Sequence, residues 1–142
     1  MKKGFTLIEI MIVVALIAIL VAIAIPNVLG VKNSGNISQA KSELAALQAA
    51  LESYYLSTGS YPAAVNDLTS ATPNIIGTTL PTDTFVSGAN YGYNLSPSAV
   101  YFVVWSAGTG GLASASINDS GSVSESDGSC IFISNGDRDT TP

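Results

Sequence analysis

An apolar run near the N-terminus constrains this chain more than any other feature. Residues 5–25 include a single charged side chain, Glu9, and residues 10–25 are all apolar. At about 1.5 Å per residue, a helix over the whole run is roughly 30 Å long, which matches one bilayer core. Because Lys2 and Lys3 precede the run, the positive-inside rule predicts a cytoplasmic N-terminus with the remaining chain across the membrane.

Three interpretations of this run compete. Small residues at positions 22–24 fit the cleavage site of a secretory signal peptide, and the run also fits a plain membrane anchor. In the third, a short leader is removed and the apolar segment stays on the mature protein. Glu9 favours the third, since a carboxylate costs about 2.5–3.5 kcal/mol at the bilayer centre and the first two gain nothing from it. A Glu9 merely tolerated near the cytoplasmic headgroups is the alternative.

Residues 2–9, Lys-Lys-Gly-Phe-Thr-Leu-Ile-Glu, resemble the prepilin N-terminus of type IV pilins, type II secretion pseudopilins and related filament subunits. The resemblance implies that a dedicated membrane peptidase cuts after Gly4 and methylates the new amine of Phe5. It makes Glu9 the fifth residue of the mature chain, where this family keeps a glutamate. It also places Pro26 where many members have a helix-disturbing proline.

The chemistry of such an N-terminus can be argued independently. Removal of the leader leaves a positive amine on Phe5, and a filament packs such helices side by side with little water. Buried charges must be paired or neutralised, so Glu9 of one subunit pairing with the Phe5 amine of a neighbour would satisfy both and set the axial register. Residues 10–25 would supply most of the association energy once out of lipid.

The rest of the chain predicts an α+β fold. We expect a bend or partly melted stretch at 24–35, because Pro26 cannot donate to the helix ladder; a helix that simply ends there is the alternative. An amphipathic helix follows, with Ser34 or Asn36 as its cap and Gly59 as its stop. Its apolar stripe is spaced by three and four residues: Ile37, Ala40, Leu44, Leu47, Leu51 and Tyr54.

Strand signals dominate the C-terminal half. Residues 90–95 and 100–106 read as a hairpin, with 100–105 as the central strand covered on one face by the helix. We predict a third strand at residues 112–118 and a fourth at 129–134. Residues 60–68 are predicted to form a turn and a short helix. We therefore expect a leader at 1–4, an apolar helix at 5–31, and a globular domain at 32–142 with a small antiparallel sheet of three or four strands.

Composition excludes several functions. The net charge is −5, or −7 without Lys2 and Lys3, and no basic stripe is present, so nucleic acid is not a main partner. Histidine is absent, which removes the commonest general base and metal ligand. With serines scattered through polar turns, no catalytic constellation emerges, so a membrane-anchored periplasmic enzyme is the least favoured class. Cys130 has no disulfide partner within the chain and reads as a core residue.

Acidic residues near the C-terminus are candidate metal ligands. Asp119 and Asp127 are the calcium candidates, with Glu125, Asp137 and Asp139 nearby. Calcium prefers oxygen-rich loops, but these acids lack a fixed ligand spacing, and solvated turn acids remain the alternative. The Gly-rich turn at Gly108 lacks both a lysine and a following helix, so it is not a phosphate-binding loop. Asn36, Asn94 and Asn118 begin glycosylation sequons.

Two kinds of filament stay open. Tyr61-Pro62, Leu80-Pro81-Thr82-Asp83 and the turn at 106–110 resemble segments of major pseudopilins of type II secretion, although Thr109 stands where an acid is often found. The lone Cys130 does not allow the C-terminal disulfide of many major pilins. A major pseudopilin is therefore the first expectation and a type IV pilus subunit the alternative. Either implies a homo-oligomeric filament, a prepilin peptidase, an inner-membrane assembly platform and membrane lipid before assembly. The precursor would lie in the inner membrane, and the filament in the periplasm or outside the cell.

Overall fold

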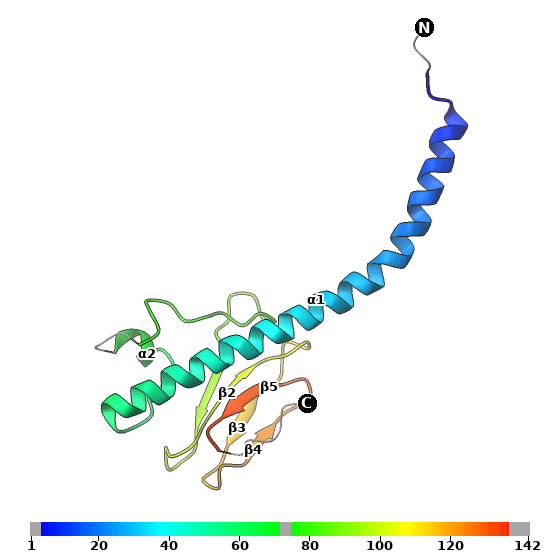
Figure 1. The fold of residues 1–142 in the computed structure, drawn as a ribbon. Coiled ribbons are helices and arrows are strands. Elements are labelled where there is room, and N and C mark those ends of the chain that lie inside the picture. The colour runs from blue at the N-terminus through cyan, green and yellow to red at the C-terminus, as the bar shows by residue number, and fades with distance from the viewer. Residues whose placement is uncertain (1–3, 72–74, 137–142) are drawn as a thin grey trace. The chain divides into compact units, whose positions relative to one another are not determined.

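A single long helix, α1 (Leu7–Thr58), forms the N-terminal part of the chain (Figure 1). The structure is a computed structural model that describes residues 4–71 and 75–136, without the side chains of residues 25–29. Two compact units are separated between Gly35 and Asn36. The helix is uninterrupted across residues 24–35, so neither the partly melted stretch nor the helix end considered there is present.

Of the two caps expected for the amphipathic helix, the one at its start is wrong and the one at its end is confirmed. Ser34 and Asn36 lie inside the helix and cap nothing; the Ser34 hydroxyl donates to the Gly30 carbonyl at 3.1 Å. This bond to the preceding turn lets a serine remain within a helix. Gly59 does end α1: its φ is 80° and its N–H donates to the Tyr55 carbonyl at 2.8 Å. Glycine tolerates this left-handed conformation, as C-terminal caps require.

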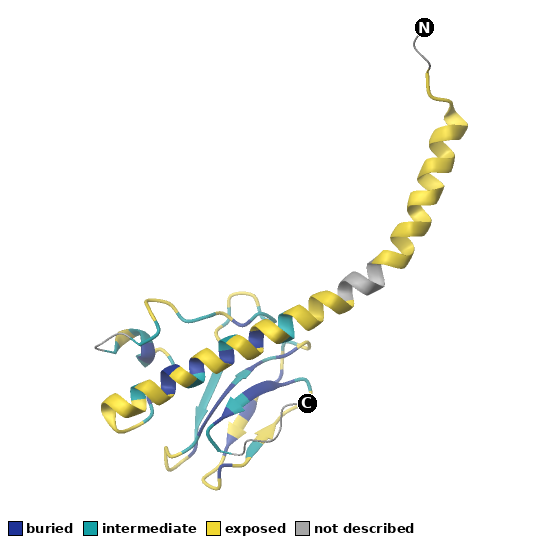
Figure 2. Cartoon of the chain, in the orientation of Figure 1, coloured by how far each residue is buried: buried dark blue, intermediate teal, exposed yellow. Residues whose placement is uncertain are grey.

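The predicted apolar stripe of α1 packs into the main core of the globular unit. Ala40, Leu44, Leu47 and Leu51 are buried, and Ile37 and Tyr54 at its two ends are partly buried. Figure 2 shows these buried positions along one side of the second half of α1. The stripe meets Phe102 and Val104 of the central strand, as the spacing predicted.

The main sheet has three antiparallel strands in the order β1-β2-β5. They are β1 (Gly92–Leu95), β2 (Phe102–Ser106) and β5 (Ile131–Ser134). Tyr93 pairs with Val104, and Val104 pairs with Ile133 on the other side. The expected hairpin, the central position of β2 and the strand near residue 131 are thus all confirmed.

A separate two-stranded ribbon completes the β structure. It pairs β3 (Ala115–Ile117) with β4 (Val123–Glu125). The sequence predicted β3 as a further strand but did not predict β4, whose three residues include one apolar side chain, Val123. Residues of the ribbon pack with Val103, Trp105 and Phe132 in a second core cluster. Strand β2 is apolar at successive positions because α1 covers one of its faces and the ribbon covers the other.

The connection between α1 and the sheet contains little regular structure. Among its described residues it holds one short helix, α2 (Asp67–Ser70), which begins near the end of the segment expected to form a turn and short helix. A single bridge joins Thr82 to Asn90 in antiparallel fashion. Leu68 of α2 is fully buried in the main core, so the connection is anchored by an apolar side chain as well as by polar contacts.

Candidate processing and assembly site

The residues around the expected cleavage point are open to solvent. Residues 4–6 precede α1 without regular structure, and the side chain of Phe5 is 79% exposed. No atom lies within 4 Å of where a Cβ on Gly4 would stand. A peptidase needs an accessible peptide, and the bond between Gly4 and Phe5 lies between two exposed residues without regular structure.

Thr6 caps the start of α1, a role that the sequence reasoning missed. Its hydroxyl oxygen accepts a hydrogen bond from the Glu9 backbone N–H at 3.3 Å and so caps the start of α1. The pattern Thr6-x-x-Glu9 is that of a capping box and was the available signal. Glu9 lies in the first turn of α1, where the positive end of the helix dipole favours a carboxylate. Glu9 can therefore stabilise the helix start.

The first half of α1 is apolar and is not buried in the part of the chain that the structure describes. Residues Leu7–Ala24 have a mean hydropathy of 3.1, and no residue of this stretch is buried. Figure 2 shows this part of the helix as exposed. By length and composition it is able to cross a membrane. Such a surface needs either lipid or other apolar helices around it.

Pro26 lies inside α1 rather than beyond its end. A proline there removes the hydrogen bond to the carbonyl four residues earlier, that of Ala22, and its ring crowds that carbonyl. The Pro26 side chain lies outside the described residues. The bend assigned to Pro26 therefore stays a prediction.

The two calcium candidates lie in separate hydrogen-bonded turns. Asp119 accepts from the Ser98 N–H at 2.7 Å, and Asp127 accepts from the Ser129 N–H at 2.8 Å and hydroxyl at 2.6 Å. Hydrogen bonds from Ser98 and Ser129 lower the pKa values of these two exposed carboxyls. Within residues 4–71 and 75–136, no three acidic or cysteine side chains gather as metal ligands. Asp137 and Asp139 lie outside those ranges, and calcium binding stays a prediction.

Asp83 is a buried carboxylate whose structural role the sequence reasoning did not assign. It is 5% exposed and accepts from the Phe85 N–H at 3.0 Å, the Ser106 hydroxyl at 2.7 Å and the Ala107 N–H at 2.8 Å. These three donors satisfy the buried carboxyl group. Asp83 therefore fastens the connection before β1 to the end of β2.

A second polar contact fastens the same connection to α1. The Tyr91 hydroxyl donates to the Glu43 carboxylate, and it lies 3.3 Å from the Thr84 hydroxyl. Burial, together with the bond to Glu43, raises the pKa of Tyr91 to about 12.

On the opposite side of the sheet, Cys130 is buried in the second cluster as expected, and burial raises the pKa of its thiol to about 11.

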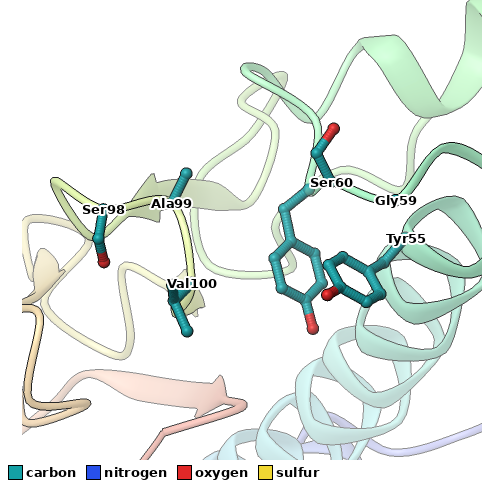
Figure 3. Close-up of a pocket in the computed structure, with 7 residues that line it drawn as sticks. Tyr55, Gly59, Ser60, Ser98, Ala99 and Val100 are labelled. Carbon is teal, nitrogen blue, oxygen red and sulfur yellow. The ribbon is translucent and has the colours of Figure 1, made fainter.

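A shallow hollow of about 410 Å³ lies where the end of α1 meets the turn before β2 (Figure 3). Tyr55, Gly59 and the adjoining Ser60-Tyr61 form one wall, and the turn at 98–100 forms the other. The rings of Tyr55 and Tyr61 stack with their centroids 4.7 Å apart. Tyr61 in turn packs on Phe102 at 4.8 Å, which ties the wall to the core.

Two known protein families match different parts of the chain. Residues 1–25 match the prokaryotic N-terminal methylation motif, and residues 27–123 match type II secretion system (T2SS) protein G. The chain belongs to the type II secretion system protein G family. The methylation-motif match includes Gly4, Phe5 and Glu9, whereas the T2SS protein G match spans most of the globular unit.

Curated relatives of this protein G family member include both secretion and pilus proteins. The type II secretion system core protein G of Pseudomonas aeruginosa is 41% identical over 61 residues, which is 43% of each chain. That of Escherichia coli is 39% identical over the same length, 43% of this chain and 42% of the relative. The type IV major pilin protein PilA of Myxococcus xanthus is 38% identical over 98 residues, 69% of this chain and 39% of the relative.

These matches span about two fifths of the length of the curated relatives. No solved structure matches the chain significantly. The recognition of a prepilin-type N-terminus on a pilin-like chain is confirmed, as is the α+β fold of a long helix followed by a small antiparallel sheet.

Proposed function

We propose that this chain is the major subunit of a periplasmic filament that serves type II protein secretion. The observation that carries the proposal is the exposed apolar half of α1, with Glu9 in its first turn, on a member of the protein G family. An apolar surface of this size without an internal partner supports packing against identical helices. The role is structural rather than enzymatic.

The route to that filament uses the membrane first. The precursor is held in the inner membrane by the apolar half of α1, with Lys2 and Lys3 in the cytoplasm and the globular domain in the periplasm. A prepilin peptidase removes residues 1–4 and methylates the amine of Phe5. An assembly platform in the inner membrane then extracts the subunit, and the apolar helix exchanges lipid for neighbouring helices. Glu9 pairs with the Phe5 amine of an adjacent subunit during this step.

Mass spectrometry of the intact protein from purified filaments or membranes tests this route. The expected mature chain starts at Phe5 and carries one N-terminal methyl group. A Gly4→Leu variant should keep the leader and stay in the membrane, whereas Lys3→Arg, which retains the leader charge, should be processed normally. A mature chain that starts after Ala24 would identify an ordinary signal peptide and would end the proposal.

A type IV pilus subunit is the second candidate, and one observation favours it. The match to the pilin of Myxococcus xanthus covers 69% of this chain, more than the 43% covered by the secretion proteins. Deletion of the gene distinguishes the two functions. A pseudopilin deletion should leave secreted proteins in the periplasm, whereas a pilin deletion should remove surface fibres and leave secretion intact.

A further inference from the structure

Asn135 directly follows β5 and bonds to two distant segments through one side chain. Its amide oxygen accepts from the Phe102 N–H at 2.7 Å, at the first residue of β2. Its amide nitrogen donates to the Tyr61 hydroxyl at 3.1 Å and to the Val100 carbonyl at 3.0 Å. The loop after α1 and the start of β2 are thus joined to the end of β5, and these three hydrogen bonds form what we call the Asn135 clamp.

An amide supplies this set of bonds and a carboxylate does not. An asparagine side chain has two N–H donors and one acceptor oxygen. An ionised aspartate has nearly the same shape but only acceptor oxygens, so it would place an oxygen against the Val100 carbonyl oxygen. The Tyr61 hydroxyl can turn to donate, whereas the Val100 carbonyl cannot. Replacing the amide by a carboxylate therefore removes a bond and sets two acceptors against each other.

The residue after Asn135 is a glycine for a packing reason. A Cβ at position 136 would overlap the Gly121 carbonyl oxygen and would lie 2.8 Å from the Gly121 Cα. Both of these are backbone atoms, so no side chain can turn aside to make room. Position 136 therefore requires glycine, and Asn135 is the one asparagine in the sequence that a glycine follows.

An asparagine followed by glycine is chemically labile in water. The backbone nitrogen of the next residue can attack the asparagine Cγ, and glycine has no side chain to hinder the attack. The new N–Cγ bond forms, the Cγ–Nδ2 bond breaks, and the amide leaves as ammonia with the proton from the attacking nitrogen. Water then opens the cyclic imide at one of its two carbonyls. In sum, asparagine and water give aspartic or isoaspartic acid and ammonia, without an enzyme or a cofactor.

From these features we propose that Asn135 is a self-modification site whose reaction with water is controlled by folding. In the folded subunit the clamp holds the side-chain amide and the contact with Gly121 holds the Gly136 backbone. These contacts must break before Cγ can meet the attacking nitrogen. In a chain whose globular unit is open, both groups are free to react. The product lacks the donor for Val100, so a modified chain cannot re-form the clamp. The inference concerns the globular unit and holds for either kind of filament.

Deamidation of the full-length protein in detergent, folded or unfolded in urea at the same pH and temperature, tests the control by folding. Peptide mass spectrometry measures the exchange of ammonia for water at each asparagine. Asn135 should react at least about tenfold faster in the unfolded protein, because reaction in the folded protein first requires local opening. Asn118, which precedes Asp119, is the internal control and should react more slowly than Asn135 in the unfolded chain. Equal rates at Asn135 in the two states, or a faster reaction at Asn118, would overturn the inference.

Two phenylalanine variants separate the clamp from the packing around it. Tyr61→Phe removes one acceptor of the clamp and keeps the ring that packs on Tyr55 and Phe102. In the folded protein it should speed the reaction at Asn135 about two- to tenfold, the range expected for the loss of one hydrogen bond. Tyr55→Phe keeps all three bonds of the clamp and should react at the wild-type rate. Equal rates in the two variants would contradict the role of the clamp.

Asn135→Asp reproduces one product of the reaction. This variant should melt at a lower temperature than the wild type or fail to fold, because the carboxylate cannot donate to the Val100 carbonyl. Asn33→Asp adds the same charge at an exposed position of α1, outside the globular unit, and should leave the melting temperature unchanged. An Asn135→Asp protein that melts with the wild type would overturn the inference that modification prevents the clamp from re-forming.

Discussion

At the residue scale, one glycine in β1 makes room for the single tryptophan of the chain. Gly92 pairs directly with Trp105 on β2. A Cβ at position 92 would overlap the indole ring, which lies across the glycine backbone. The ring belongs to the second core cluster, on the ribbon side of the sheet. Gly92 is therefore required by a close approach of a side chain rather than by a turn.

Gly92→Ala should destabilise the globular unit because the added methyl group displaces the Trp105 ring. Overpacking of this kind costs about 1–3 kcal/mol. Gly110→Ala is a matched control, because a Cβ at position 110 would meet only the Ser129 hydroxyl oxygen at 3.7 Å. Denaturant unfolding of the full-length protein in detergent, followed by tryptophan fluorescence, measures both. Equal unfolding midpoints for the two variants would contradict the packing role of Gly92.

Calcium binding is the other prediction at this scale. If Asp119 and Asp127 hold a calcium ion, millimolar calcium should raise the melting temperature relative to a chelator, because ligand binding to the folded state alone stabilises it. Asp119→Ala or Asp127→Ala should then abolish the shift, whereas Asp67→Ala in α2 should preserve it. Equal melting temperatures with calcium and with chelator would show that the two carboxylates only accept hydrogen bonds within their own turns.

At the scale of elements, α1 is one helix with two different surroundings. Its second half is stabilised by burial of the apolar stripe in the core, while residues Leu7–Ala24 of its first half are not buried. Pro26 lies within the helix near the change from one to the other. A proline inside a helix lacks the N–H that would donate to the carbonyl four residues earlier, so we expect the helix to be weakest near Pro26.

Pro26→Ala should strengthen the helix around residues 22–30. The change restores a backbone N–H that can donate to the Ala22 carbonyl, and a proline inside a helix costs about 3 kcal/mol relative to alanine. Amide hydrogen exchange of the full-length protein in detergent should become slower in this segment and stay unchanged in β2. Equal exchange in both proteins would mean that Pro26 does not weaken the helix.

Tyr91 links α1 to the connection before β1, and its ionisation should break that link. Its folded-state pKa is raised from 10.0 to about 12, so the neutral phenol stabilises the fold below pH 10. As pH rises from about 10 to about 12, the unfolded chain loses its proton first and stability falls. Thermal melts across this range should show a smaller decline for Tyr91→Phe than for the wild type. An identical decline in both would assign the effect to other tyrosines.

At the scale of the whole molecule, the globular unit and the first part of α1 differ sharply in burial. The globular unit has two packed core clusters, whereas residues Leu7–Ala24 have no buried residue. Glu9 lies in the first turn of this exposed segment. Its proposed pairing with a neighbouring subunit is a prediction that substitutions at this position can test.

Glu9 variants separate a capping role from a pairing role. Glu9→Val should insert into the membrane normally but assemble poorly, because the neighbouring Phe5 amine is left without a counter-charge. Glu9→Gln keeps a side chain able to cap the helix but removes the charge, so it should also assemble poorly. Sheared filament yield, with wild-type coexpression as the rescue control, measures the effect. Normal assembly of the Gln variant would show that helix capping is sufficient.

Local patterns in the sequence determined much of this protein. The apolar run, the stripe from Ile37 to Tyr54, the stop at Gly59 and the β1–β2 hairpin each depend on side chains that are close in sequence, and each was predicted. The prepilin-type N-terminus was also readable from a short motif. Local propensities act over one or two turns of chain, so these features need no knowledge of distant contacts.

Only the tertiary structure decided the rest. Strand β4 was not predicted because its three residues carry one apolar side chain, and its pairing with β3 is formed across a turn with little hydrophobic signal. The burial of Asp83 depends on donors at Ser106 and Ala107, more than 20 positions away. The hollow likewise joins the end of α1 to a turn about 40 residues later. Such features depend on which distant segments meet, and residue spacing along the chain carries no record of that.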